Sequence, residues 1–99
     1  MDKVTVVVDG KAKANGSVQL EFLPIGGEPR LITVNVIAKT KDKDIARDIH
    51  KELTLVAGGA YKLKLSGGDV KISKKDKSAP NISVVVTGLA LPGVSVSIK

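Results

Sequence analysis

Lysine side chains carry the clearest chemical pattern in this sequence. From Tyr61 to Lys77 the chain reads YKLKLSGGDVKISKKDK, and its first three lysines lie opposite Leu63, Leu65 and Ile72 if the segment is extended. A row of ammonium groups on one side of two strands can contact nucleic-acid phosphates or protein carboxylates. The predicted basic surface consists of Lys62, Lys64, Lys71, Lys74, Lys75 and Lys77.

The composition of this lysine-rich segment weighs against a nucleic-acid site. Tyr61 falls on the apolar side of its strand, so the segment offers no aromatic ring for base stacking. All the cations are lysine, which lacks the bidentate geometry with which arginine recognises bases and phosphates. Outward lysines also protect exposed sheet edges from unwanted pairing. A basic binding module for nucleic acid or an acidic protein is therefore the alternative function, which the sequence does not favour.

His50 is the one histidine, so a hydrolytic or metal site would have to depend on it. No Gly-x-Ser-x-Gly motif supplies a serine nucleophile. The nearest carboxylates, Asp48 and Glu52, stand at i−2 and i+2 and therefore fall on other faces of a helix. We expect a surface histidine and neither a catalytic nor a metal site.

Glycine-rich stretches at Gly26-Gly27, Gly58-Gly59 and Ser66–Asp69 invite a phosphate-loop interpretation. The first two lack the Gly-x-x-x-x-Gly-Lys-Ser/Thr pattern, and the third lies between strands rather than before a helix. We interpret all three as turns. The sequence also contains no cysteine, which excludes thiol catalysis and thiolate metal ligands. It therefore predicts no cofactor, no small-molecule substrate and no enzymatic activity.

Length and composition indicate one domain over residues 1–99. Apolar residues make up 42% of the chain, and valine and isoleucine dominate them, which favours an aliphatic core built from strands. No apolar run approaches the roughly 18 residues of a membrane span, so no membrane partner is expected. The net charge of +6 leaves two interpretations open, attraction to acidic partners or ordinary solubility.

Short strands account for most of the remaining pattern. Apolar and polar residues alternate in Ser17–Phe22, as in an antiparallel sheet with one face in water. Ser66-Gly67-Gly68 separates two such strands and predicts a tight hairpin. Lys11–Ala14 fits either a ribbon extension or a mobile loop. The predicted strands are Lys3–Val8, Ser17–Phe22, Leu31–Ala38, Tyr61–Leu65, Asp69–Ser73, Asn81–Thr87 and Val94–Ile98.

One helix is predicted, over Thr40–Leu55. Thr40 or Asp42 is expected to cap its N-terminus, and Gly58-Gly59 to prevent its continuation. The narrow apolar stripe indicates that one face packs on a sheet while the charged face stays in water. The stripe consists of Ile45, Ala46, Ile49 and Leu53.

The order of these elements is three strands, one helix and four strands. It lacks the βαβ alternation of doubly wound nucleotide-binding folds. The sequence therefore predicts a strand-rich α+β fold. We expect a mainly antiparallel sheet, or a small sandwich, of about six or seven strands with the helix packed across it.

Aliphatic residues next to turns supply a candidate interface. Burial within the domain is hard to arrange at such positions, and exposed apolar residues often mark contacts between proteins. They can equally be core residues from loops that fold back. The candidate interface residues are Leu23, Ile25, Leu89 and Leu91.

The order of features from Leu31 to the end resembles a small domain of bacteriophage contractile-tail sheath proteins and related virion components. The family pattern runs from an apolar strand to a helix with Ile-Ala, a Gly-containing hairpin, an Asn-led apolar strand and Pro-Gly before a last strand. About two-thirds of the chain follows it. The matching segments are ITVNVIA, KDKDIARDIH, YKLKL, SGGDVKIS, PNISVVV and LPGVSVSI.

The resemblance implies a structural role. Sheath proteins are much longer than this chain, so it implies a capsid decoration or minor tail protein rather than a sheath subunit. Expected partners are further copies of the chain or other virion proteins, and the expected location is the virion, assembled in the host cytoplasm. The family offers no catalytic residues to carry over.

Overall fold

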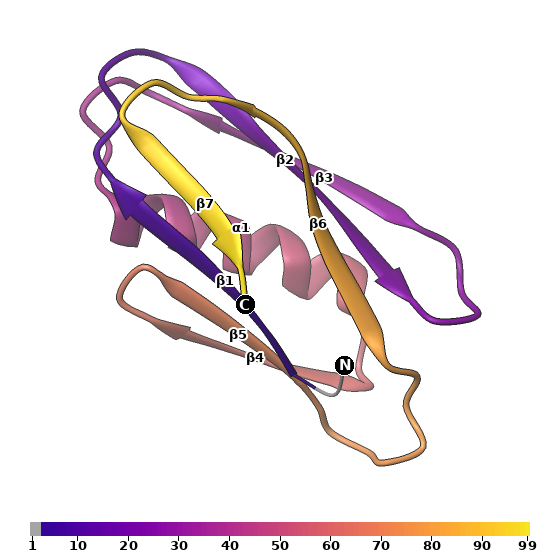
Figure 1. Cartoon of the computed structure of the whole chain (residues 1–99). Coiled ribbons are helices and arrows are strands. Elements are labelled where there is room, and N and C mark those ends of the chain that lie inside the picture. The colour runs from indigo at the N-terminus through magenta and orange to yellow at the C-terminus, as the bar shows by residue number, and fades with distance from the viewer. Residues whose placement is uncertain (1–2) are drawn as a thin grey trace.

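Two antiparallel sheets and one helix make up the structure, a computed structural model that describes residues 3–99. The four-stranded sheet has the order β4-β5-β1-β7, with β4 Tyr61–Ser66, β5 Asp69–Lys74, β1 Lys3–Gly10 and β7 Val94–Ile98. The three-stranded sheet has the order β3-β2-β6, with β3 Arg30–Val36, β2 Gly16–Pro24 and β6 Ile82–Ala90 (Figure 1). The predicted α+β fold, strand-rich with a single helix, is confirmed.

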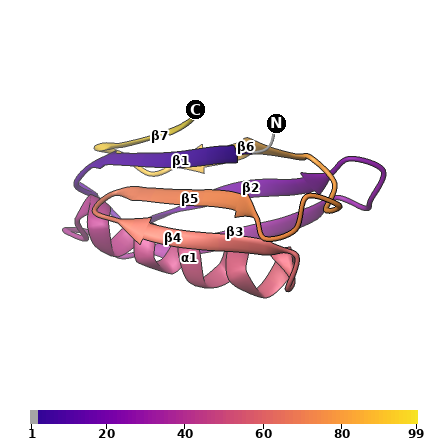
Figure 2. The ribbon, with the colours of Figure 1, turned by 90° about the horizontal axis from the view of Figure 1, so that it is seen from below.

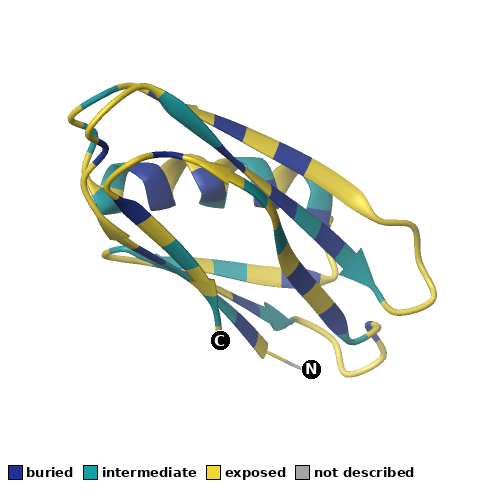
Figure 3. Cartoon of the chain, turned by 45° about the horizontal axis from the view of Figure 1, so that its top comes forward, coloured by how far each residue is buried: buried dark blue, intermediate teal, exposed yellow. Residues whose placement is uncertain are grey.

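Alternating side chains build the core between the two sheets. Figure 3 shows buried and exposed positions as successive bands along the strands. The inward valines of β1 and the inward residues of β2 belong to one buried cluster, and the Phe22 and Tyr61 rings meet edge to face with centroids 5.6 Å apart. The Tyr61 hydroxyl donates to the Pro80 carbonyl at 2.6 Å, so this phenol is satisfied. The core is aliphatic and β-branched, as the composition predicts.

The helix α1 (Asp42–Ala57) closes one side of the sandwich. It contacts the edge strands β3 and β4 of the two sheets, and it also reaches β1, β2 and β5 (Figure 2). Its 16 residues span about 24 Å, comparable to the length of the strands beside it. The predicted stripe is fully buried, and Ala57 extends it by one turn beyond Leu53. The helix therefore seals the gap between the sheets and does not lie across a single sheet.

Local hydrogen bonds set the start of α1 differently from the sequence prediction. Neither Thr40 nor Asp42 caps the helix; the N-cap is Lys41, which makes no side-chain cap bond. The Thr40 hydroxyl instead donates to the Ile37 carbonyl at 2.7 Å, and Asp42 accepts from the Lys43 amide within the first turn. Gly58, with φ 76°, ends the helix as predicted. Within residues 3–99, no helix is long and apolar enough to cross a membrane.

Two connections between the sheets meet at the end of the sandwich where α1 begins, and we call this place the crossing. The β1–β2 and β6–β7 links pass side by side, and Lys11 and Lys13 donate their amides to the Gly93 and Pro92 carbonyls. Gly10 has φ +104°, and a Cβ there would overlap the Gly93 carbonyl oxygen. Glycine at this position therefore allows the two links to approach.

The segment Lys11–Ala14, for which the sequence left two interpretations open, is tied down at this crossing. Ala12 is buried, donates to the Thr40 carbonyl at 2.9 Å and accepts from the Lys39 amide at 2.7 Å. The Asn15 side chain accepts from the Ala38 amide at 2.8 Å. These bonds draw Ala38 out of β3, which is why that strand ends at Val36.

Two leucines of α1 provide a matched test of its packing. Leu53 is 0% exposed and Leu55 is 71% exposed. We expect Leu53→Ala to lower the free energy of unfolding by about 2–5 kcal/mol through lost burial and a residual cavity. Leu55→Ala should change it by less than about 0.5 kcal/mol. Urea denaturation of both variants measures the difference, and equal losses would contradict the packing described.

Two glycines test the crossing in the same way. Gly10→Ala places a methyl group against the Gly93 carbonyl at a positive φ, so we expect a loss on the order of 3 kcal/mol in unfolding free energy. Gly59 has no atom within 4 Å of an added Cβ and no positive φ. Gly59→Ala should be neutral or stabilise by up to about 1 kcal/mol. Thermal unfolding followed by circular dichroism compares the two, and equal melting temperatures of Gly10→Ala and Gly59→Ala would contradict the close approach.

Candidate functional site

The outer face of the four-stranded sheet gathers lysines from separate parts of the chain. The strand register places Lys62, Ser73 and Lys3 in one row across β4, β5 and β1. The next row contains Lys64, Lys71 and Thr5. Lys99 follows at its end, because it exchanges backbone hydrogen bonds with Thr5 at 2.8 and 2.9 Å. We call this surface the basic face, defined by Lys3, Lys62, Lys64, Lys71 and Lys99.

Like charges lie next to each other on the basic face. Lys64 and Lys71 are directly opposite in the β4–β5 pair, an arrangement that destabilises a sheet. None of the five lysines forms an ion pair or a side-chain hydrogen bond with another described residue. The acids of this sheet face, Asp69 and Asp9, stand in rows nearer its other end. The lysines therefore gather toward one end of the strands and the acids toward the other, and neither lysine row contains an acid that would balance its charge.

A shallow hollow of ≈ 220 Å³ lies between the side chains of these rows. Its polar lining comes from the hydroxyls of Thr5 and Ser73 and from the lysines on both sides. It is open to solvent and lies where β4, β5 and β1 run next to each other. The hollow can accept an anionic group that several ammonium groups approach from different strands.

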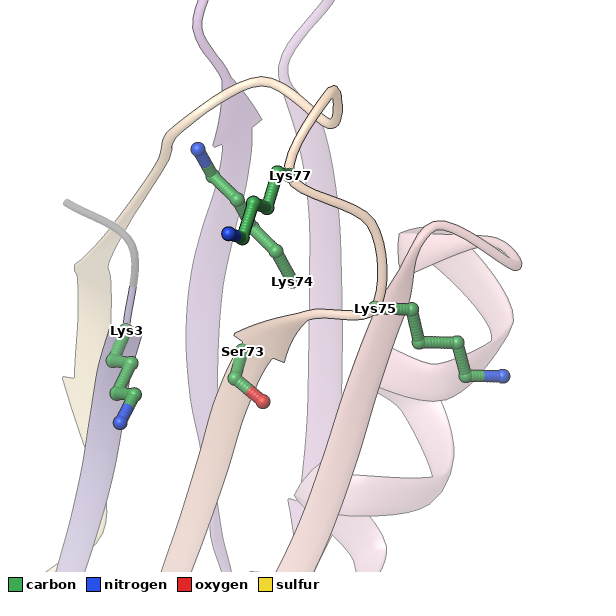
Figure 4. A pocket seen from close by; sticks show the side chains of 5 residues that line it. All are labelled: Lys3, Ser73, Lys74, Lys75 and Lys77. Atoms are coloured by element: carbon green, nitrogen blue, oxygen red, sulfur yellow. The ribbon is translucent and has the colours of Figure 1, made fainter.

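The loop lysines predicted for the same surface separate into two directions. Lys74, Lys75 and Lys77 line a larger hollow of ≈ 530 Å³ together with Lys3 and Ser73. In Figure 4 Lys75 extends past β4 toward the α1 side, whereas Lys74 and Lys77 extend toward the β1 side. The structure thus joins Lys62, Lys64 and Lys71 in one surface and places Lys77 at its border, whereas Lys74 pairs with the buried Tyr61 and so belongs to the core side of β5.

Asp76 shapes this loop. Its carboxylate accepts from the Ser78 backbone amide at 3.0 Å, and that hydrogen bond holds the pKa of Asp76 below its ordinary value. A lowered folded-state pKa means that the bond supports the loop above the ordinary carboxyl pKa. The support is lost as the pH falls through the folded-state value.

His50 lies half-buried between α1 and the edge strand β4. Its Nε2 is 3.3 Å from the Leu63 carbonyl oxygen, and because a carbonyl can only accept, the ring donates there. The sequence predicts a surface histidine, and this is only partly met. The half-buried His50 ring donates a hydrogen bond to a backbone carbonyl of the edge strand β4. Among residues 3–99, no three histidine or acidic side chains gather closely enough to hold a metal ion.

The outer face of the three-stranded sheet has the opposite character. Its one charged side chain is Glu21, and the register places Glu21 between Leu31 on β3 and Val85 on β6. Leu31 is 67% exposed and Val85 is 51% exposed. We call this surface the low-charge face, defined by its outward residues Ser17, Gln19, Glu21, Leu23, Leu31, Thr33, Asn35, Ser83, Val85 and Thr87.

The predicted interface residues do not form one surface. Leu23 belongs to the low-charge face, and Ile25 is exposed just beyond the end of β2. Leu89 is partly exposed but pairs with the buried Val18, so it lies on the core side of β6. Of the two interpretations of Leu91, the structure supports that of a core residue, because Leu91 is 4% exposed. Its loop folds back onto the core at the crossing of the two connections.

The sequence prediction lacked Lys3 and Lys99 of the basic face and Leu31 and Val85 of the low-charge face. Alternation with buried neighbours already marks Lys3, Leu31 and Val85 as outward, but no pattern in the sequence states which strands pair. Lys3 joins Lys62 only through the β1–β5 pair, and Lys99 joins through β7. Pairing between distant strands is therefore what assembles both faces.

Comparison with models of protein families gives no match to this chain, and comparison with curated proteins finds no matching sequence. We therefore infer function from the charges, burial and register of the chain itself.

The like-charge pair on the basic face can be tested through stability. Lys71→Glu replaces repulsion with attraction opposite Lys64, so we expect it to raise the unfolding free energy by about 0.2–1 kcal/mol at low salt. The gain should shrink as salt screens the pair. Lys62→Glu, whose direct neighbour is Ser73, should gain less. Denaturant titration at two salt concentrations measures this, and a loss of stability in Lys71→Glu would contradict the register.

Proposed function

We propose that this chain is a non-enzymatic structural protein that acts by self-association and docking, as a bacteriophage capsid decoration or minor tail protein. The observation that carries the proposal is the low-charge face. Charged residues make up 26% of the sequence, yet Glu21 is the single charge among the outward residues of this sheet. A low density of charged residues around exposed aliphatic side chains is typical of the core of a protein interface.

A second copy of the chain is the partner that this face fits best. Two such faces can stack at the roughly 10 Å separation of packed sheets, with Leu31 and Val85 of each copy in contact. The net charge of +6 opposes association of two copies elsewhere on the surface. The low-charge face is where that repulsion is smallest, because the lysines of the basic face point away on the other sheet.

The size of the face sets the expected strength. Three strands of this length offer on the order of 400 Å², about half of what each partner contributes to a standard stable interface. An isolated pair should therefore be weak, with a dissociation constant on the order of 10⁻⁴ M. Such contacts become effective when many copies are held in a lattice, since each further contact is then intramolecular.

The element order that resembles sheath-protein domains supports a place in the virion. The strand-rich architecture with one helix agrees with that order of elements. The proposed location is the assembled virion, formed in the host cytoplasm. A reading frame placed among capsid and tail genes would add independent support.

Self-association is tested on the full chain by sedimentation equilibrium across concentrations up to about 1 mM. We expect a concentration-dependent dimer that Leu31→Lys with Val85→Lys converts to a monomer. Leu55→Lys, a matched exposed leucine on α1, should leave association unchanged.

Glu21 provides a test in the opposite direction. In a two-fold pair the Glu21 carboxylates of both copies approach each other, so Glu21→Gln should tighten the dimer several-fold. A strict monomer at every concentration, in both the wild type and Glu21→Gln, would overturn self-association through this face.

A further inference from the structure

We propose that the basic face binds the phosphate backbone of double-stranded nucleic acid without regard to base sequence. This inference goes beyond the structural role and does not rest on it, because it uses the other sheet. It starts from the two lysine rows that the register assembles across β4, β5, β1 and β7.

Protection of a sheet edge does not explain every lysine of the basic face. Lys62 and Lys64 lie on the edge strand β4, where outward lysines discourage unwanted pairing. Lys71 lies on β5 and is paired with β4 on one side and with β1 on the other. Its ammonium group therefore adds repulsion to Lys64 without guarding any edge. Repulsion retained at an inner strand indicates a ligand that neutralises it.

The dimensions of the face fit a polyanion. From β4 to β7 the second row extends about 14 Å, and the two rows stand about 7 Å apart along the strands. Phosphates of one DNA strand repeat about every 3.4 Å along the duplex axis, so this row covers about four of them. The acids Asp9 and Asp69 stand in rows beyond it, toward the other end of the strands, and leave the lysine rows unobstructed.

The residue types select a duplex over a single strand. The one phenylalanine and the one tyrosine, Phe22 and Tyr61, are buried against each other. The basic face therefore has no aromatic side chain on which unpaired bases could stack. Lysine contributes point charges and no bidentate base recognition, which suits contact with a continuous backbone.

The described residues of the basic face include no large exposed aliphatic side chain. This composition favours nucleic acid over a protein as the partner. Protein interfaces depend on an apolar centre surrounded by a polar rim. On the basic face the residues between the lysines are Thr5 and Ser73, whose hydroxyls can also donate to phosphate oxygens.

The test is fluorescence anisotropy of the full chain with a labelled duplex of mixed sequence, about 20 base pairs long, over about 50–200 mM salt. We expect the slope of log K against log salt to be about −4. Lys64→Gln with Lys71→Gln should weaken low-salt binding about tenfold and reduce the slope by about 2. This variant removes repulsion, so it should remain folded.

Lys43→Gln with Lys51→Gln is the matched control. Both lysines are exposed on α1, and this variant lowers the net charge by the same amount. It should bind duplex with nearly the wild-type slope. Equal weakening of the two double variants would overturn the assignment to the basic face, and so would a wild-type chain that fails to bind at low salt.

Competing anions complete the test. The same titration uses single-stranded DNA, poly-glutamate and vesicles containing phosphatidylserine. Duplex should bind more tightly than each of them. Stronger binding to poly-glutamate or to vesicles would assign the face to an acidic protein or a lipid surface and overturn the proposal. Loss of duplex binding leaves dimer formation unaffected, so failure of this inference and failure of the proposed function are distinguishable.

Discussion

Burial of the α1 stripe is the contact on which the sandwich depends. The two sheets approach each other where β6 and β7 meet, and they diverge toward β3 and β4. Without the helix, the inward valines and isoleucines of both sheets would face water along that open side. Ile45, Ile49 and Leu53 fill it and are fully buried. The position of one amphipathic helix therefore decides whether seven short strands share a single core.

Closure of the sandwich leaves two outer faces, and their chemistry is divided between them. Lysines of one sheet stand in unbalanced rows, while the other sheet presents aliphatic and uncharged side chains around Glu21. Each arrangement departs from the mixed charge that keeps an ordinary surface soluble and inert. Local rules of stability are commonly broken at surfaces that bind something, and here both departures occur on flat sheet faces.

Local pattern predicted the elements well because its causes are local. Alternation over Ser17–Phe22 and the helical stripe after Thr40 each reflect neighbours within a few residues. The ends of elements were less accurate. Asn15 and Ala12 take hydrogen bonds from Ala38 and Lys39, and Thr40 bonds to Ile37 instead of capping the helix. Partners from distant segments compete for the same backbone groups, and no local pattern contains them.

The sequence by itself determined the strand-rich α+β class, the helix with its buried face, and the lysines Lys62, Lys64 and Lys71 on one side of a hairpin. Each follows from periodicity within one segment. Tertiary structure alone decided that Lys3 and Lys99 join those lysines, that Leu31 and Val85 flank Glu21, and that Leu91 is buried. The physical reason is the register between distant strands, which depends on closing both sheets around one core and cannot be deduced from any single segment.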